Sequence, residues 1–251
     1  MTPQISILIP AFNEEQFIAE VIGRVRQSFD TISYPSYEII VCDNNSTDGT
    51  GEIARANGAT VVVEPHNQIA RARNTAAKSA KGKWLIFLDA DTFLTPEILG
   101  KTIHALEGGK ICAGGCQLKF DREDIGLFPA LMTGIWNRVS GFVNLAAGSY
   151  LFCYREAWAD LGGFDEEVYA GEEIFFSQKL KAWAKARGMK FKVLTGDPVV
   201  TSARKMDWYG QRQLFGHMMM MLLPGAIKQR DKCELWYTRP AQKTGTDSSS
   251  T

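Results

Sequence analysis

The sequence predicts an α/β fold with a mostly parallel central sheet and helices on both faces. Short apolar runs occupy residues 5–9, 38–42, 61–63 and 84–88. Amphipathic segments separate them, with Phe17, Val21 and Val25 recurring at helical spacing. Strands that alternate with helices are typical of parallel sheets that are covered on both sides. Residues 1–94 are therefore expected to form one α/β unit.

The remaining elements follow from turn and cap signals. Asn13 is expected to cap the first helix, where Glu14 and Glu15 would favour its positive end. Pro96 suits the first turn of a later helix, and Gly188 suits a helix C-terminus. We predict helices at about 50–56, 68–80 and 172–186, strands at 111–120, 150–154, 191–194 and 199–200, and an amphipathic segment at 208–223.

Composition limits the classes of protein to consider. The 251 residues carry 28 basic and 28 acidic side chains, so net charge gives no reason to expect a nucleic-acid partner. The five scattered cysteines and the absence of a leader-like N-terminus predict a reduced, cytoplasmic protein. No run reaches the roughly 20 apolar residues of a spanning helix. We expect one domain, 1–228, divided at about residue 94, and a partly disordered tail, 229–251.

The segment FLDADT, residues 87–92, is the most informative part of the chain. Asp89 and Asp91 follow an apolar strand, and ligands of open α/β sheets bind at that end of the strands. Two such carboxylates can hold Mg²⁺ or Mn²⁺, which usually share their ligands with substrate phosphates. An acidic pair at a strand end can equally form a turn or cap a helix.

Three further positions carry candidate chemistry. Arg73 could clamp a phosphate with two parallel hydrogen bonds, whereas Arg71 better fits a salt bridge on a solvated helix face. Glu172 and Glu173 begin a helix, where acidic residues are favourable in any case. Either glutamate could also take a proton from a hydroxyl.

Five segments in order carry a resemblance to a known family. They are ISILIPAFNEE, IIVCDNNSTDGT, RARN, WLIFLDADT and GGFDEEVYAGEE, within residues 5–173. Together they resemble glycosyltransferase family 2, whose enzymes have the GT-A fold. The resemblance, which extends over roughly residues 4–200, implies transfer of a sugar from a nucleotide-diphosphate sugar to an acceptor hydroxyl. It also implies inversion at the anomeric carbon, a Mg²⁺ or Mn²⁺ cofactor and, by family frequency, a UDP-sugar donor.

The resemblance assigns roles to particular residues. Residues 1–94 would bind the donor nucleotide, and residues 95–228 would form the acceptor half. Asp91 would hold the metal, with Asp89 near the ribose and the metal, and Glu173 or Glu172 would be the base. The residues implied on the nucleotide side are Pro10, Ala11, Asn13, Glu14, Asp43, Arg73, Asp89 and Ala90, and those on the sugar and acceptor side are Gly148, Ser149 and Asp165.

The chain departs from the family pattern at two of these sites. Asn44-Asn45 replaces a commoner Asp-Gly, and Glu173 stands where the family has aspartate, so Glu172 remains a candidate base. His217 is a weaker candidate metal ligand. The methionine-rich segment within 208–223 could rest on a membrane that carries a lipid-linked acceptor, or form a core helix or a homo-oligomer contact. The acceptor, a glycan or a lipid-linked molecule, is not fixed.

Two other functions are compatible with this type of sheet. A sugar-phosphate nucleotidyltransferase would need a glycine-rich, arginine-containing loop after the first strand, where PAFNEE stands instead. A catalytically inactive nucleotide-binding scaffold is the alternative from another class, because fold does not imply function. The intact Asp89/Asp91 pair argues against it.

Overall fold

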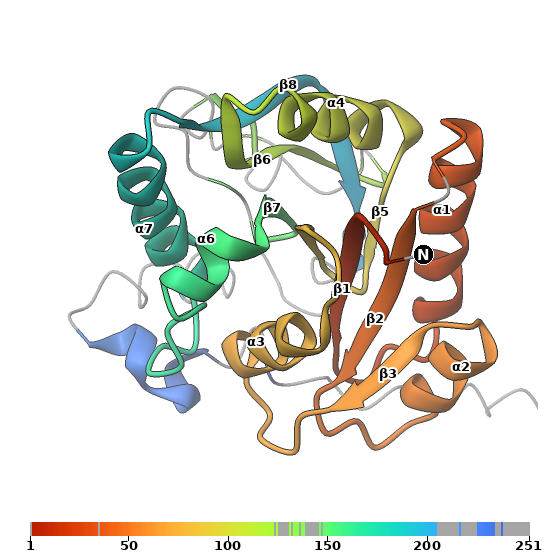
Figure 1. Ribbon diagram of the computed structural model, residues 1–251. Coiled ribbons are helices and arrows are strands. Elements are labelled where there is room, and N and C mark those ends of the chain that lie inside the picture. The colour runs from red at the N-terminus through yellow and green to blue at the C-terminus, as the bar shows by residue number, and fades with distance from the viewer. Residues whose placement is uncertain are drawn as a thin grey trace, which may run out of the picture.

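A computed structural model describes most of the chain (Figure 1). The described residues are 2–34, 36–122, 124, 131, 133–135, 137, 138, 146, 148–204, 216, 225–233 and 237. The predicted amphipathic segment 208–223 and most of 121–147 therefore lie outside them, apart from single positions.

The described strands form one mixed sheet. Its order is β3-β2-β1-β4-β7-β6-β8-β5. The first four of these strands are parallel, β7 runs antiparallel to both of its neighbours, β6 and β8 are parallel, and β5 is antiparallel to β8. The strands are β1 (Ile5–Ala11), β2 (Tyr37–Asp43), β3 (Thr60–Val63), β4 (Trp84–Leu88), β5 (Thr92–Phe93), β6 (Ile111–Phe120), β7 (Tyr150–Tyr154) and β8 (Lys190–Thr201).

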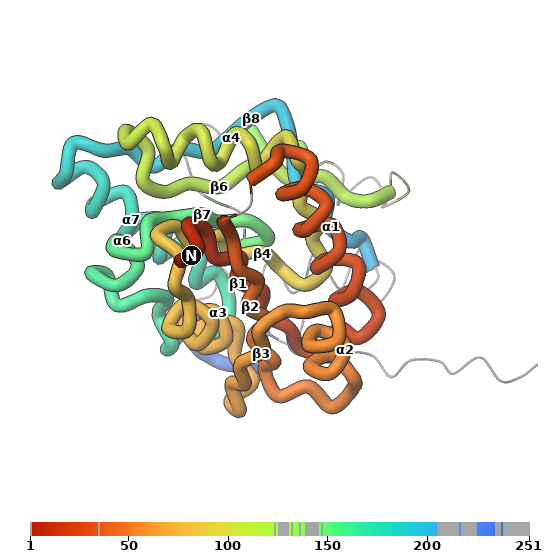
Figure 2. Tube along the Cα trace, turned by 45° about the vertical axis from the view of Figure 1, so that its right-hand side comes forward, coloured from red at the N-terminus to blue at the C-terminus, as the bar shows by residue number. Residues whose placement is uncertain are grey.

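Helices cover both faces of this sheet, which confirms the predicted fold class. They are α1 (Ile18–Thr31), α2 (Thr50–Ala56), α3 (Ile69–Ser79), α4 (Pro96–Glu107), α6 (Arg155–Asp160) and α7 (Glu172–Ala186), with short 3₁₀ helices η1 (Ala226–Lys228) and η2 (Arg230–Cys233). Alternate β1 residues face opposite layers: Ile7 packs with α1 and α4, whereas Leu8 packs with α3 and α7. Figures 1 and 2 show α1 and α3 on opposite sides of β1 and β2.

The first helix starts later than the sequence predicts. Asn13 does not cap it: α1 begins at Ile18, after an N-cap residue, Phe17, whose side chain makes no capping bond. Asn13 instead has a left-handed backbone, with φ of 53°, and its Oδ1 accepts a 2.8 Å hydrogen bond from the Thr47 amide. Glu15 likewise contacts a different helix, because its Oε2 accepts a hydrogen bond from the amide of Gly49, just before α2. The local sequence alone does not distinguish a side chain that caps a helix from one that binds a neighbouring loop.

One difference concerns the second half. The predicted strands 191–194 and 199–200 are parts of one strand, β8, whose outer end pairs with the short β5. The five cysteines are buried free thiols. None of the helices in the described part of the chain is both long and apolar enough to cross a membrane.

A substitution at Gly114 tests how closely the chain packs within the sheet. It lies in β6 between Phe152 and Lys192, and an added methyl group would collide with the Lys192 carbonyl and approach Phe152 Cζ to 2.6 Å. We expect Gly114→Ala to lower the free energy of unfolding by about 3 kcal/mol. Gly100→Ala, in α4, is the control, because nothing lies within 4 Å of its added methyl group. Helix propensity makes that change neutral or stabilising by about 0.5–1 kcal/mol. Equal denaturant midpoints for the two variants would contradict this packing.

Candidate active site

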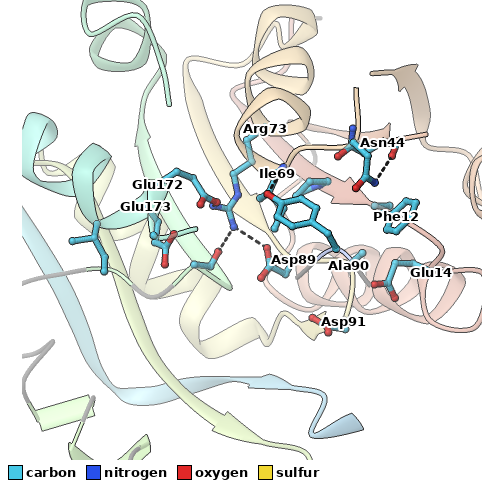
Figure 3. A pocket seen from close by; sticks show the side chains of 17 residues that line it. Phe12, Glu14, Asn44, Ile69, Arg73, Asp89, Ala90, Asp91, Glu172 and Glu173 are labelled. Carbon is cyan, nitrogen blue, oxygen red and sulfur yellow. Dashed lines mark hydrogen bonds and ion pairs between the residues drawn. The ribbon is translucent and has the colours of Figure 1, made fainter. Parts of the chain in front are cut away.

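A cavity of about 160 Å³ lies at the carboxyl ends of β1, β2 and β4 (Figure 3). Ligands of open α/β sheets bind at this edge. Gly171 and the first turn of α7 close the opposite wall. The lining residues are Pro10, Ala11, Phe12, Glu14, Asn44, Asn67, Ile69, Arg73, Asp89, Ala90, Asp91, Gly148, Gly171, Glu172, Glu173, Ile174 and Tyr237.

Arg73 joins the two walls of the cavity. It extends from α3 and is 3% exposed. Its Nη1 lies 2.6 Å from Glu172 Oε1, while its Nη2 lies 3.0 Å from Asp89 Oδ1 and donates a 2.8 Å hydrogen bond to the Gly148 carbonyl. Burial lowers the pKa of the guanidinium, but the surrounding carboxylates raise it by more, so Arg73 is charged. A single buried cation therefore fixes three separate chain segments.

The neighbouring Asn74 anchors the loop that leads toward α7. Its Oδ1 accepts from the Phe164 amide at 2.9 Å, and its Nδ2 donates to the Phe164 carbonyl and to Glu166 Oε1. Gly163 passes close to this amide with φ of +76°, and an added Cβ would collide with Asn74 Oδ1. The segments RARN and GGFD thus contact each other through the Asn74 side chain.

Arg204 forms an ion pair with the other carboxylate of the Asp-x-Asp pair, that of Asp91. Its Nη2 lies 3.1 Å from Asp91 Oδ2 and 2.5 Å from Glu14 Oε1. Glu14 and Asp91 are 4% and 6% exposed, so both acids are buried beside this arginine. Each aspartate of the pair consequently has its own arginine: Asp89 has Arg73, and Asp91 has Arg204.

Glu173 differs from Glu172 in its surroundings. Glu172 is held by Arg73, whereas Glu173 is half-buried at the cavity beside Gly148, where an added Cβ would lie 3.3 Å from Glu173 Oε1. Burial, and after it the neighbouring Glu172, raises the pKa of Glu173 to about 8 despite the opposing effect of Arg73. A carboxyl group with such a pKa can exchange a proton near neutral pH.

The structure brings most of the predicted site residues together. Ten of them line the cavity: Pro10, Ala11, Glu14, Arg73, Asp89, Ala90, Asp91, Gly148, Glu172 and Glu173. Ser149 adjoins it through its backbone, since its carbonyl accepts from the Asp89 amide. Their roles in binding and catalysis stay predictions.

Besides Ser149, three predicted residues do not line this cavity, and each has another hydrogen-bond partner. Asn13 binds Thr47, as described above. Asp43 Oδ1 accepts from the Ser46 amide, and Asp165 Oδ1 accepts from the Glu167 amide. Arg71 forms the expected surface ion pair, 2.8 Å from Glu166. His217 and the segment 208–223 lie outside the described residues, except for position 216.

Asn44 and Tyr237 are among the lining residues that were not predicted. Asn44 follows β2, and its side chain binds the carbonyls of Glu64 and His66 and the amide of Gln68, which holds the loop before α3. The departure from Asp-Gly at this position was its sequence signal. Tyr237 is 6% exposed, and its hydroxyl donates to the Tyr169 carbonyl and accepts from the Ile69 amide. It comes from the region expected to be tail, and no pattern around it pointed to the site.

The donor set of the cavity fits a hard divalent cation that is completed by a substrate. Within the described part of the chain, no three His, Cys, Asp or Glu side chains gather as a ready-made metal site. Mg²⁺ is commonly held by one or two carboxylates together with substrate phosphates. Asp91 and Asp89 offer those carboxylate oxygens at the cavity wall.

Comparison with known proteins identifies the family. The model of glycosyl transferase family 2 matches residues 6–151, more than half of the chain. The chain therefore belongs to this family. It is 26% identical to the glycosyltransferase AglE of Haloferax volcanii over 194 residues, which cover 70% of this chain and 61% of AglE. It is 33% identical to WfaP of Escherichia coli, a UDP-Glc:α-D-GlcNAc-diphosphoundecaprenol β-1,3-glucosyltransferase, over 112 residues, or 43% of each protein. The chain thus spans less than two thirds of these relatives.

Solved structures share the fold. The mannosyltransferase PcManGT of Pyrobaculum calidifontis, in complex with GDP-Man and Mn²⁺, has a TM-score of 0.64 at 22% identity, over 80% of this chain and 57% of that one. S. aureus TarS 1–349 in complex with UDP-GlcNAc has a TM-score of 0.63 at 18% identity, over 93% and 70%. At such identities the likeness shows the fold alone.

Removal of Arg73 should destabilise the protein strongly. Arg73→Gln would leave Asp89, Glu172 and Glu173 together without their buried cation. We expect a loss of about 3–5 kcal/mol in the free energy of unfolding, measured by denaturant titration at pH 7. Arg71→Gln is the matched control on the same helix, with its side chain 39% exposed, and should cost less than about 1 kcal/mol.

A second change separates buried charge from simple loss of packing. Glu172→Gln in the Arg73→Gln background removes one of the stranded carboxylates. It should recover part of the lost stability, whereas further destabilisation would show that the ion pair does not dominate.

Proposed function

We propose that this chain transfers a sugar from a nucleotide-diphosphate sugar to an acceptor hydroxyl, with inversion and with the assistance of Mg²⁺ or Mn²⁺. The observation that carries the proposal is the cavity itself, which places Asp89, Asp91 and Glu173 around one space at the carboxyl edge of the sheet. Membership of glycosyl transferase family 2 supports it. The shared fold with complexes of GDP-Man and Mn²⁺ and of UDP-GlcNAc agrees with it.

The two ends of the cavity suggest how the donor lies. The nucleotide would rest against Pro10, Ala11 and Phe12, beside Asn44, where the wall is formed by the ends of β1 and β2. The diphosphate would lie near Asp89 and Asp91, which would hold the cation. When bound, the cation would neutralise the charge that grows on the leaving diphosphate. The sugar would then lie between these aspartates and Glu173, close to Gly148, whose lack of a side chain leaves room.

Glu173 is the proposed base. Glu172 is paired with Arg73 and Glu14 with Arg204, whereas Glu173 is the cavity glutamate that forms no ion pair with an arginine among the described residues. The acceptor hydroxyl would give its proton to Glu173 as its oxygen attacks the anomeric carbon, while the bond from that carbon to the diphosphate breaks. Glu172 would act through Arg73, by orienting it toward Asp89 and Gly148. Glu172 is therefore a positioning residue in this account.

The donor and acceptor are proposed at the level of chemical class. A UDP-sugar is the default donor, in line with the UDP-Glc donor that the name of WfaP gives. A lipid-linked acceptor is consistent with the diphosphoundecaprenol acceptor of WfaP. It is also consistent with the undecaprenyl-phosphate named for a relative from Edwardsiella ictaluri, a 4-deoxy-4-formamido-L-arabinose transferase that is 29% identical over 168 residues.

Ligand-dependent thermal stability tests this proposal and the donor base together. The protein would be melted with UDP, GDP, dTDP, CDP or ADP, each with and without Mn²⁺. A ligand at about 100 times its dissociation constant adds roughly 2.7 kcal/mol of stability, so a specific nucleotide should raise the melting temperature measurably. We expect one nucleotide to do so when Mn²⁺ is present, and Asp91→Ala to abolish that metal-dependent shift. The absence of a shift with every nucleotide, or an unchanged shift in Asp91→Ala, would contradict the proposed site.

The role of Glu173 predicts a pH dependence. Because a base must be ionised and the pKa of Glu173 is raised to about 8, activity is lost as the pH falls below that value. The acidic limb of kcat/KM should therefore lie well above the ordinary carboxylate range and toward pH 8. Initial rates measured between about pH 5 and pH 9 would locate this acidic limb.

Substitution of the same residue gives the complementary test. Glu173→Gln should keep nucleotide affinity and lower kcat by about 10²–10⁴-fold. Glu167→Gln, at an exposed residue of the preceding loop, is the control and should leave both unchanged. Turnover that persists in Glu173→Gln would move the base to another group.

A further inference from the structure

Arg204 occupies an unusual place for a cation in a site that is proposed to bind a metal. One nitrogen, Nη2, is within hydrogen-bond distance of both Glu14 Oε1 and Asp91 Oδ2. The side chain is 13% exposed, and its guanidinium lies over the Phe17 ring, 4.5 Å from the centroid. Arg204 therefore already neutralises the carboxylate that the Asp-x-Asp pair would offer to a divalent cation.

The backbone delivers Arg204 to this position. β5 pairs with the end of β8 through Thr92 and Thr201, whose hydroxyl groups are 3.1 Å apart. The Ser202 amide then donates a 2.9 Å hydrogen bond to the Asp91 carbonyl. The segment after β8 is consequently fastened to the same residue whose side chain Arg204 binds, and Arg204 can turn its side chain without losing these anchors.

A guanidinium and a divalent cation compete for Asp91. Both are positive, both need the same carboxylate oxygens, and a cation bound at Asp91 would repel an arginine nitrogen 3.1 Å from Oδ2. Arg204 is also suited to another partner, because a guanidinium can bind phosphate oxygens with two parallel hydrogen bonds. The other arginine of the site, Arg73, is fixed by Glu172, Asp89 and Gly148 and is 3% exposed.

We propose that Arg204 holds Asp91 while the donor is absent and exchanges it for the donor's diphosphate when the divalent cation binds. This inference rests on the proposed function, and it adds a device that couples two ligands. In the donor-free protein, Arg204 weakens binding of the cation alone. When a nucleoside diphosphate arrives, its phosphates take Arg204 and release Asp91. As a result, each ligand raises the affinity for the other by more than the direct contact between the cation and the phosphates would.

Binding measurements with Mn²⁺ and UDP, repeated with GDP, test this exchange without any transfer reaction. Free Mn²⁺ would be followed by electron paramagnetic resonance, and nucleotide affinity by calorimetry. Relative to the natural chain, Arg204→Gln should bind Mn²⁺ alone more tightly and the nucleotide with Mn²⁺ less tightly. The factor by which Mn²⁺ tightens nucleotide binding should fall by about 5–150-fold, the usual range for coupled sites.

Two further variants exclude trivial explanations. Arg187→Gln, which removes an ion pair to Asp160 at the far end of α7, is the matched control and should leave the coupling factor unchanged. Arg204→Gln with Glu14→Gln removes one positive and one negative charge, so the local net charge is kept and no second buried carboxylate is left beside Asp91. This double variant should also lose the coupling, which separates the exchange from a change in net charge or in folding.

The outcomes distinguish the exchange from the proposed function. If the natural chain binds Mn²⁺ and a nucleotide and both Arg204 variants keep the same coupling factor, the exchange is wrong while the proposed function stands. Tighter binding of Mn²⁺ alone by the natural chain than by either variant would overturn the exchange as well. If no form of the protein binds Mn²⁺ with either nucleotide, both the exchange and the metal-assisted transfer are wrong.

Discussion

The contact of Arg73 with Glu172, Asp89 and the Gly148 carbonyl is the interaction on which the rest of the site depends. Five carboxylates line one small cavity, and such a cluster is costly to bury unless cations compensate it. Arg73 supplies that charge from α3, and Asn74 beside it fixes the loop that approaches α7. Arg73 and Asn74 of the segment RARN therefore connect the part of the sheet near β1 with the part near β7 and with α7.

Much of the fold could be predicted because it rests on local signals. The apolar runs of β1, β2 and β4, the helical spacing in α1 and the glycine after α7 are visible in the sequence, and β4 leads directly to Asp89 and Asp91. Ligands of open α/β sheets bind at the carboxyl ends of the strands, and Asp91 was placed at the site on this ground. Pro10, Arg73 and Glu173 also line the cavity, and they were assigned to the site through the family resemblance.

The remaining features depend on contacts between distant segments. Asn13 has the composition of a helix cap, but its partner is Thr47, which no local pattern reveals. Tyr237 reaches the cavity from a region more than 160 residues away from its partner Ile69. The pairing of Arg204 with Glu14 spans a separation of 190 residues and needs the β5–β8 pairing. These contacts decide how charge is distributed in the site, and tertiary packing alone creates them.

We propose Asp91 as the cation ligand of a donor site from which Arg204 is displaced. A crystal structure of the protein with Mn²⁺ and UDP or GDP, with anomalous scattering used to locate manganese, tests it most directly. We expect a manganese peak bonded to an Asp91 oxygen and to the diphosphate, with the Arg204 guanidinium moved from Asp91 onto a phosphate. A peak elsewhere, or an Arg204 that still binds Asp91 beside the bound nucleotide, would contradict it.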